Sequence, residues 1–193
     1  MKKSLLTKSI IAAGIVGSLT AANAGSLGDL KFYAGAGVDY NMYSFDSSLK
    51  DDNNITSKGI GFTVPILGVK FHENFGLEAG YSFNKKITST DKADPNDKDS
   101  IKVRNMYIDL MGFMPVADQF ELLGGLGLGK LSLISNATGI SKNKTSWRAK
   151  IGAQYNVVTN LALRAVFSYQ NADKTKIGIK NVKNIGLYGV YTF

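Results

Sequence analysis

The sequence predicts an all-β protein, an eight-stranded antiparallel up-and-down transmembrane β-barrel preceded by a cleavable signal peptide. Three observations support this fold class. Apolar residues recur at every second position through most of the chain, which is the period of a strand and not of a helix. The connections between these segments alternate between long and short. After the first 24 residues no run of 18 apolar residues occurs, so a membrane-spanning helix is not expected.

The N-terminal segment has the three parts of a signal peptide. Three lysines among the first eight residues form a basic start, an apolar run follows, and Ala22-Asn23-Ala24 is a small-x-small cleavage site. The apolar run is too short to span about 30 Å of hydrocarbon. We therefore expect a signal peptide at 1–24 and one barrel domain at 25–193, with an uncleaved membrane anchor as the alternative.

Eight segments have the period of a strand. Five alternate clearly between apolar residues and polar or glycine residues: Lys31–Tyr43, Asn74–Asn84, Ser146–Val157, Asn160–Gln170 and Asn184–Phe193. Three alternate less clearly: Gly59–Phe71, Ile101–Met114 and Phe120–Leu133. Pro65 interrupts the first of these three. Because proline cannot donate to a strand ladder, we expect a bulge or a change of face there.

The connections alternate in length along the chain. Those after the first, third, fifth and seventh strands are long and polar, at 44–58, 85–100, 134–145 and 171–183. The other three are tight turns, at 72–74, 115–119 and 158–159. Long loops at one end, with short turns and both termini at the other, are typical of outer-membrane barrels. We expect extracellular long loops and periplasmic mature termini in a Gram-negative cell. A soluble β-sandwich is the alternative, although it needs no aromatic residues at both ends of its apolar rows.

Charged residues fall on the face opposite the apolar rows. An arginine or lysine that faces lipid at mid-membrane costs about 2–4 kcal/mol, so we assign this face to the lumen. The predicted lumenal charge network is Asp39, Lys70, Glu78, Asp109, Glu121, Arg148, Lys150 and Arg164. Two interpretations are open: a polar plug that fills the narrow lumen and fixes the strand register, or a gated path for protons or ions. Glycines on the same face, which let long neighbours cross the lumen, are Gly35, Gly37, Gly68, Gly80, Gly125, Gly127, Gly129, Gly152 and Gly186.

The chain is basic, with a formal net charge of +8 from 23 basic and 15 acidic residues. Without the first 24 residues, 20 basic and 15 acidic residues remain, a charge of +5. This excess favours a surface that faces anionic lipid or lipopolysaccharide, and an exported protein is not expected to bind nucleic acid. The predicted ligand-contact lysines of the last two long loops are Lys142, Lys144, Lys174, Lys176 and Lys180. The simpler interpretation is that these lysines form a solvated surface. The more specific interpretation is that they contact an acidic host glycan or protein.

The residues that catalysis or metal binding usually requires are scarce. The chain has no cysteine and one histidine, His72, which falls in a predicted short turn. We therefore expect no catalytic site, no transition-metal site and no cofactor. The glycines of Gly124–Gly129 do not indicate a dinucleotide site, because the residues that follow continue as a strand and not as a helix.

Several segments together resemble the OmpA/OmpX-like family of small outer-membrane barrels, and its opacity-type members in particular. They are the hairpin Leu67–Phe71 with Asn74–Tyr81, the glycine-rich Gly124–Gly129, and the C-terminal Gly189–Phe193. The resemblance implies that Tyr191 and Phe193 belong to the signal read by the barrel-assembly machinery. Members of this family include adhesins, immune-evasion proteins, structural anchors and lipid-modifying enzymes, so the resemblance implies the fold and leaves the role open. The leading hypothesis is a monomeric, non-enzymatic barrel that acts as a surface antigen or adhesin. A small pore or structural membrane-stabilising barrel is the alternative, since the fold alone does not choose between them.

Overall fold

The computed structural model describes most of the chain after the first 29 residues, namely 30–45, 53–55, 57–84, 87–91, 98–135, 141–172 and 178–193. The predicted signal peptide lies outside these residues. Within them, no helix is long and apolar enough to cross a membrane.

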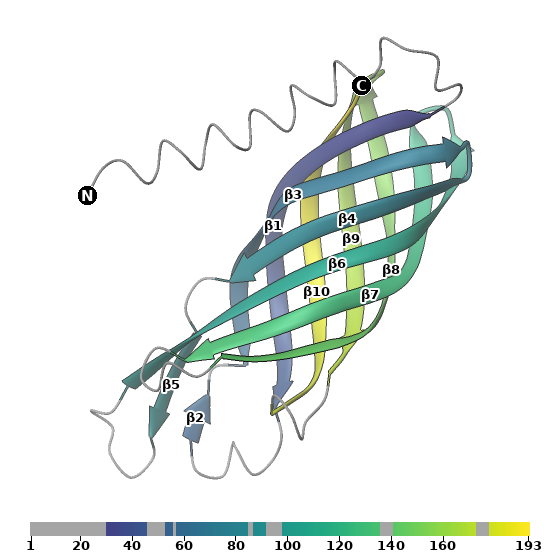
Figure 1. Ribbon diagram of the computed structural model, residues 1–193. Helices are drawn as coiled ribbons and strands as arrows, with labels where there is room; N and C mark the ends of the chain where they lie inside the picture. Colours follow the sequence, from purple (N-terminus) through teal and green to yellow (C-terminus); the bar gives the residue numbers. More distant parts are fainter. Residues whose placement is uncertain are drawn as a thin grey trace, which may run out of the picture.

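Eight long strands close into one antiparallel barrel, which confirms the predicted fold class (Figure 1). They are β1 (Lys31–Phe45), β3 (Lys58–His72), β4 (Phe75–Asn84), β6 (Lys98–Ala117), β7 (Phe120–Ser135), β8 (Ser141–Val158), β9 (Leu161–Asn171) and β10 (Ile179–Thr192). Each pairs with the next one along the chain, and β1 pairs with β10 to close the ring. Closure leaves the wall without a free edge, so its backbone N–H and C=O groups find partners within the barrel.

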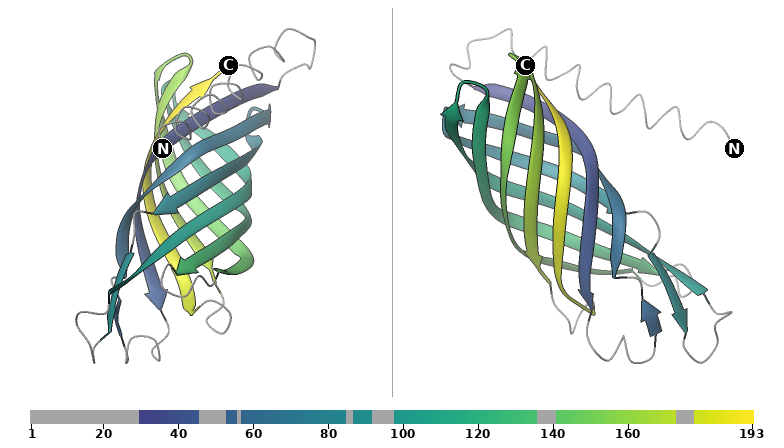
Figure 2. Two further views of the ribbon diagram at one scale, coloured as in Figure 1. Left: turned by 60° about the vertical axis from the view of Figure 1, so that its left-hand side comes forward. Right: turned by 180° about the vertical axis from the view of Figure 1, so that it is seen from behind.

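The two ends of the barrel differ (Figures 1 and 2). The terminal end holds the C-terminus, the start of β1 and three short turns at 73–74, 118–119 and 159–160. At the opposite, loop end, two short strands extend the sheet beyond the ring. They are β2 (Asn53–Ile55), which pairs with β5, and β5 (Ile87–Asp91), which pairs with β6. The predicted first and second long loops, 44–58 and 85–100, therefore contain strands of their own.

The last two predicted long loops are shorter than expected. β8 begins at Ser141 and continues its ladder with β7, so Lys142 and Lys144 lie on a strand. Similarly, β10 begins at Ile179, which places Lys180 on a strand. The backbone ladder continues at the loop end although apolar alternation stops. The predicted starts of these two strands are too late because the side-chain pattern, unlike backbone pairing, changes where the wall becomes polar.

Burial alternates along the strands and separates an apolar outer wall from the lumen. In β9 the even-numbered residues from Ala162 to Gln170 are buried, and the odd-numbered ones up to Phe167 are exposed. Leu126 and Ile151 on the outer wall are 68% and 66% exposed. Such a wall is the surface that a barrel presents to lipid. In β3 the faces change at Pro65, where the ladder has a bulge, so the predicted change of face is confirmed.

Two glycines on the inner face make room for aromatic rings. A Cβ at Gly68 would lie 2.0 Å from the ring of Tyr33, its partner in the β1–β3 ladder. A Cβ at Gly80 would lie 2.4 Å from the ring of Tyr107, its partner in the β4–β6 ladder. The absence of these side chains lets each tyrosine turn across the lumen, as the sequence predicted for glycines on this face.

A methyl group at Gly127 is expected to destabilise the barrel. Its Cβ would lie 2.0 Å from the carbonyl oxygen of Ile108 and 2.4 Å from Asp109 Oδ1, so β6 or β7 would have to shift. Gly127→Ala should lower the free energy of unfolding by about 1–3 kcal/mol, as measured by urea titration in detergent micelles. Gly189→Ala is the matched control, because a Cβ there meets nothing within 4 Å. Equal stability of the two variants would contradict the packing argument.

Candidate functional site

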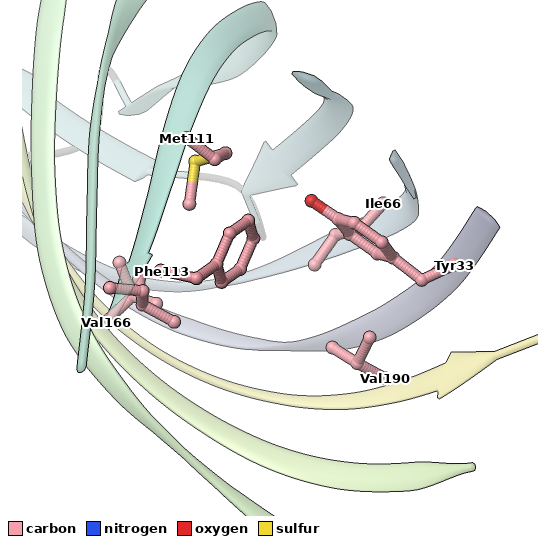
Figure 3. Packing of buried hydrophobic residues seen from close by; sticks show 7 residues of the cluster. Tyr33, Ile66, Met111, Phe113, Val166 and Val190 are labelled. Atoms are coloured by element: carbon pink, nitrogen blue, oxygen red, sulfur yellow. The ribbon is translucent and has the colours of Figure 1, made fainter. Parts of the chain in front are cut away.

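Two apolar clusters lie inside the barrel, one near each end. The cluster toward the terminal end is Tyr33, Ile66, Met111, Phe113, Leu123, Val166 and Val190 (Figure 3). The cluster toward the loop end is Tyr43, Phe45, Val103, Leu131, Ile179 and Val182. The sequence predicts polar residues and glycines on this face and does not predict these clusters. Their members are single apolar residues within polar rows, which a period-two pattern does not distinguish from noise.

Seven of the eight predicted lumenal charges join one chain of contacts inside the barrel, which we call the lumenal ladder. In order from the loop end it comprises Arg148, Asp109, Lys150, Glu78, Arg164, Gln154, Glu121 and Lys70. The charges alternate in sign along it. The structure therefore brings together residues from β3, β4, β6, β7, β8 and β9.

Glu78 lies at the centre of the lumenal ladder and is 2% exposed. Its Oε1 lies 2.5 Å from Lys150 Nζ, and its Oε2 lies 2.5 Å from Arg164 Nη1. The Tyr33 hydroxyl also donates to Oε2, at 3.0 Å. A buried carboxylate is tolerated when opposite charges and hydrogen bonds replace its water, and Glu78 has both.

Asp109 continues the lumenal ladder toward the loop end. Its Oδ2 lies 2.8 Å from Lys150 Nζ, and its Oδ1 lies 3.3 Å from Arg148 Nε. The guanidinium of Arg148 also stacks on the ring of Tyr107, with 3.8 Å from its central carbon to the ring centroid. Arg148 is thus held by a carboxylate and by an aromatic face, which a planar guanidinium suits better than an ammonium does.

Toward the terminal end the lumenal ladder passes through an uncharged residue, Gln154. Its Oε1 accepts hydrogen bonds from Arg164 Nε at 2.9 Å and Nη2 at 2.8 Å, while its Nε2 donates to Glu121 Oε2 at 3.3 Å. Lys70 Nζ then lies 3.1 Å from Glu121 Oε2, in a pair whose side chains are 18% and 19% exposed. The charge pattern does not identify Gln154, because this residue is uncharged, although it lies on the same row as Arg148 and Lys150.

Asp39 is the predicted lumenal charge that lies off the ladder. Its carboxylate accepts hydrogen bonds from Thr63 Oγ1 at 2.5 Å and from the Tyr188 hydroxyl at 2.6 Å. The ladder contains four bases and three acids, and Asp39 is the fourth acid. The charges of the whole predicted set therefore cancel.

At the terminal end of the ladder a cavity of about 570 Å³ opens beside Lys70, Glu121 and Gln154, whereas little open space is left between the side chains nearer the loop end. A cavity of about 30 Å³ lies toward the loop end and is lined by amides, including Asn41, Asn84 and Asn184. A third cavity, of about 10 Å³, lies beside Glu78 and Lys150. The two smaller volumes hold one or two waters. Side chains, rather than solvent, fill most of this part of the lumen.

The predicted contact lysines lie at the loop end as far as the structure describes them. Lys142 and Lys144 lie at the start of β8, and Lys180 lies at the start of β10. Both strand ends contact the end of β9: the Ser146 hydroxyl donates to the carbonyl of Asn171, and the carbonyl of Lys180 accepts from the N–H of Ala172 at 3.0 Å. The remaining two predicted contacts, Lys174 and Lys176, lie outside the described residues.

The C-terminal aromatic residues lie at the terminal end. Tyr191 faces outward, and its ring packs edge-on against Phe193 with 5.3 Å between ring centroids. The N–H of Phe193 donates to the carbonyl of Phe32 at 2.9 Å, which fastens the end of the chain to β1. Their recognition by the assembly machinery stays a prediction.

A closed wall that is apolar outside and charged inside defines a transmembrane β-barrel of the bacterial outer membrane. The chain belongs to the outer membrane protein beta-barrel domain family, whose model matches residues 9–193. The predicted family and fold class are thereby confirmed.

Three similar proteins illustrate this relationship. The attachment invasion locus protein of Yersinia enterocolitica is 26% identical over 179 residues, which cover 92% of this chain and 94% of that protein. The crystal structure of Ail from Yersinia pestis, in complex with the heparin analogue sucrose octasulfate, matches with a TM-score of 0.57 at 15% identity, over 85% of this chain and 99% of that one. OprG from Pseudomonas aeruginosa matches with a TM-score of 0.59 at 13% identity, over 84% and 95% of the two chains. At these identities the two structural matches concern the fold.

Removal of the charge on Glu78 is expected to destabilise the barrel strongly. Glu78→Gln would leave Arg164 buried without its carboxylate partner, which should cost about 3–5 kcal/mol of unfolding free energy in a urea titration. Glu121→Gln, at the more exposed end of the ladder, is the control and should cost less than about 1 kcal/mol. A cost at Glu78 no larger than that at Glu121 would mean that the ladder contributes little to stability.

Proposed function

We propose that this outer-membrane barrel is a non-enzymatic surface adhesin that binds sulfated, polyanionic glycans at its loop end. In this proposal the loop end faces the outside of the cell, and the terminal end faces the periplasm. The observation that carries the proposal is the position of Lys142 and Lys144 on one side of β9 and of Lys180 on the other. Neighbouring strands are about 4.8 Å apart, so β8 and β10 lie on the order of 10 Å from each other where both pair with β9. Lys180 lies next to this paired region, and Lys144 and Lys142 lie two and four residues beyond Ser146, which contacts the end of β9.

The chemistry of these side chains fits a sulfated ligand. A sulfate group stays ionised throughout the physiological pH range, and a lysine ammonium offers it a point charge with three donors. Each exposed contact is weak and is screened by salt, so several lysines are needed. The relationship to attachment invasion locus proteins supports the same ligand class, because one of them was crystallised with a heparin analogue.

The proposal of a binding role without catalysis also has structural support. Most predicted lumenal charges are engaged in the buried ladder, away from any ligand at the loop end. His72 lies at the opposite, terminal end, where its Nδ1 accepts a hydrogen bond from the N–H of Asn74 at 3.2 Å.

Removal of the loop-end lysines is expected to weaken glycan binding. Lys142→Gln/Lys144→Gln should weaken the binding of sucrose octasulfate about fivefold, as measured by isothermal titration in detergent micelles, since an exposed and a half-buried charge contact together contribute roughly 1 kcal/mol. Lys174→Gln/Lys176→Gln/Lys180→Gln should have at least the same effect. Binding by the wild type should also fall as salt rises.

The control for this experiment is Lys58→Gln/Lys183→Gln, which removes two lysines from the outer wall. Both residues are exposed: Lys58 is the first residue of β3, and Lys183 is the fifth residue of β10, further from the strand end than Lys180. This variant should bind as the wild type does. An equal loss from the control would mean that net charge, and not these strand ends, determines binding.

We propose in addition that the lumenal ladder acts as a structural plug and not as an ion path. The alternating charges and the two apolar clusters support this role, because a hydrated ion would have to displace both. The plug would hold opposite walls at a fixed distance while the loop end engages its ligand.

Planar-bilayer recordings distinguish the plug from a pore. The wild-type protein is expected to show no conductance steps, and Glu78→Gln is expected to stay silent because the apolar cluster toward the loop end still closes the lumen there. The recordings would be made on protein whose folding is verified by heat-modifiable migration. Regular steps in the wild type would contradict the plug and favour the pore.

A further inference from the structure

We propose that the outer wall carries a binding site for a phosphorylated glycolipid of the surrounding leaflet. One acyl chain would lie in an apolar hollow over Ala79, and the lipid phosphate would contact Arg104 and Lys130. This surface is separate from the strand ends that we assign to glycans. The inference rests on the orientation proposed above, with the loop end outward.

The hollow crosses β3, β4, β6 and β7 on the outer wall and has a volume of about 530 Å³. Its apolar lining includes Pro65, Leu67, Ala79, Met106, Ile108 and Leu128. Ala79 lies in one ladder row with the larger side chains of Leu67 and Ile108. A small side chain between large ones leaves a depression that an acyl chain fills without moving the wall. The volume lies within the range of lipid-sized ligand sites.

Two cations lie at the loop side of this hollow. Lys130 lines it directly and is exposed. Arg104 is exposed on β6, two residues beyond Met106, which is the ladder partner of Lys130. Diagonal neighbours of this kind have Cβ atoms about 7–8 Å apart or less, which long side chains bridge to reach one phosphate. Arginine adds a planar fork that suits phosphate oxygens. Lys102 lies two residues further along the same strand.

The acidic side chains of the barrel strands lie away from Arg104 and Lys130, which leaves these two cations available to an anion. All the acidic side chains that the structure describes within the eight barrel strands point into the lumen: Asp39, Glu78, Asp109 and Glu121. In the described residues the outer wall near Arg104 and Lys130 is therefore basic without neighbouring acids.

The depth of the two cations suits a lipid phosphate. Trp147 is 50% exposed and lies opposite Leu128 in the β7–β8 ladder, one outward-facing position below Lys130. Outward tryptophans mark the interface at which acyl chains end and headgroups begin. One outward position along a strand corresponds to about 7 Å, which places Lys130 at headgroup level.

A second hollow on the wall provides an internal comparison. It measures about 410 Å³, crosses β8, β9 and β10, and is lined by Ala153, Leu163, Ala165 and Leu187. The charged residue beside it, Arg164, points into the lumen and pairs with Glu78. This hollow could accept an acyl chain but lacks the cations that would select a phosphate.

The experiment measures lipid binding to the purified full barrel in nanodiscs of neutral phospholipid. The probes are phosphorylated lipid A and the same lipid A after enzymatic removal of its phosphates. The readouts are the emission of Trp147, the chain's one tryptophan, and native mass spectrometry. Phosphorylated lipid A should bind to the wild type at least tenfold more tightly than the dephosphorylated lipid.

Matched variants test each part of the site. Arg104→Gln/Lys130→Gln should weaken binding of phosphorylated lipid A about tenfold, while Lys58→Gln/Lys183→Gln should leave it unchanged. Ala79→Leu, which fills the hollow from outside, should weaken the binding of phosphorylated lipid A severalfold, while Ala165→Leu should not. These side chains all face outward, and heat-modifiable migration would verify that each variant is folded.

Three outcomes would overturn the inference: equal weakening by the two double charge variants, equal affinity for the two lipids, or unchanged binding by Ala79→Leu. The first indicates diffuse attraction, the second an unselective apolar surface, and the third a ligand that does not use the hollow. Titration of the same variants with sucrose octasulfate separates the two proposals. Loss of lipid A binding with intact glycan binding in Arg104→Gln/Lys130→Gln supports a distinct lipid site, and failure of the glycan proposal alone leaves this result unaffected.

Discussion

Neutralisation of charge inside a narrow cylinder is the constraint on which the structure depends, and Glu78 is central to it. The backbone ladders connect each strand only to its neighbours in the ring. The ion pair between Glu78 on β4 and Arg164 on β9 instead joins strands that are four places apart in the ring of eight. Glu78 also holds Lys150 on β8. The lumenal ladder thus fixes the cross-section of the barrel in a direction that hydrogen bonding in the wall does not control.

The same constraint organises the outer surface. The described acidic side chains of the barrel strands point into the lumen. The outer wall is therefore apolar along its length and basic near the loop end. Under the two proposals, glycans in solution bind the strand ends of β8 and β10, while lipids of the leaflet bind the wall below them. Two such surfaces need no conformational change, since both lie on strands that are held by the same backbone hydrogen bonds.

The sequence predicts those features that repeat along a strand, and it fails where a feature depends on neighbouring strands. Period two identified the eight strands and the lumenal charges, and Pro65 marked the bulge. The strand ends at Lys142 and Lys180 were missed because pairing continues beyond the apolar pattern. Gln154 and the inner aromatic residues were missed because their roles depend on what lies across the lumen. Arg104 and Lys130 become neighbours only through the register of β6 and β7.

The tyrosine and glycine that face each other across a ladder have an evolutionary consequence. The ring of Tyr33 occupies the space that any side chain at position 68 would need, although 35 residues separate the two positions in the chain. A substitution at one position therefore constrains the other: a larger residue at 68 would require a smaller one at 33 in the same lineage. Homologous sequences should therefore exchange these two residues together, so that the fold can be traced by paired changes where overall identity has faded.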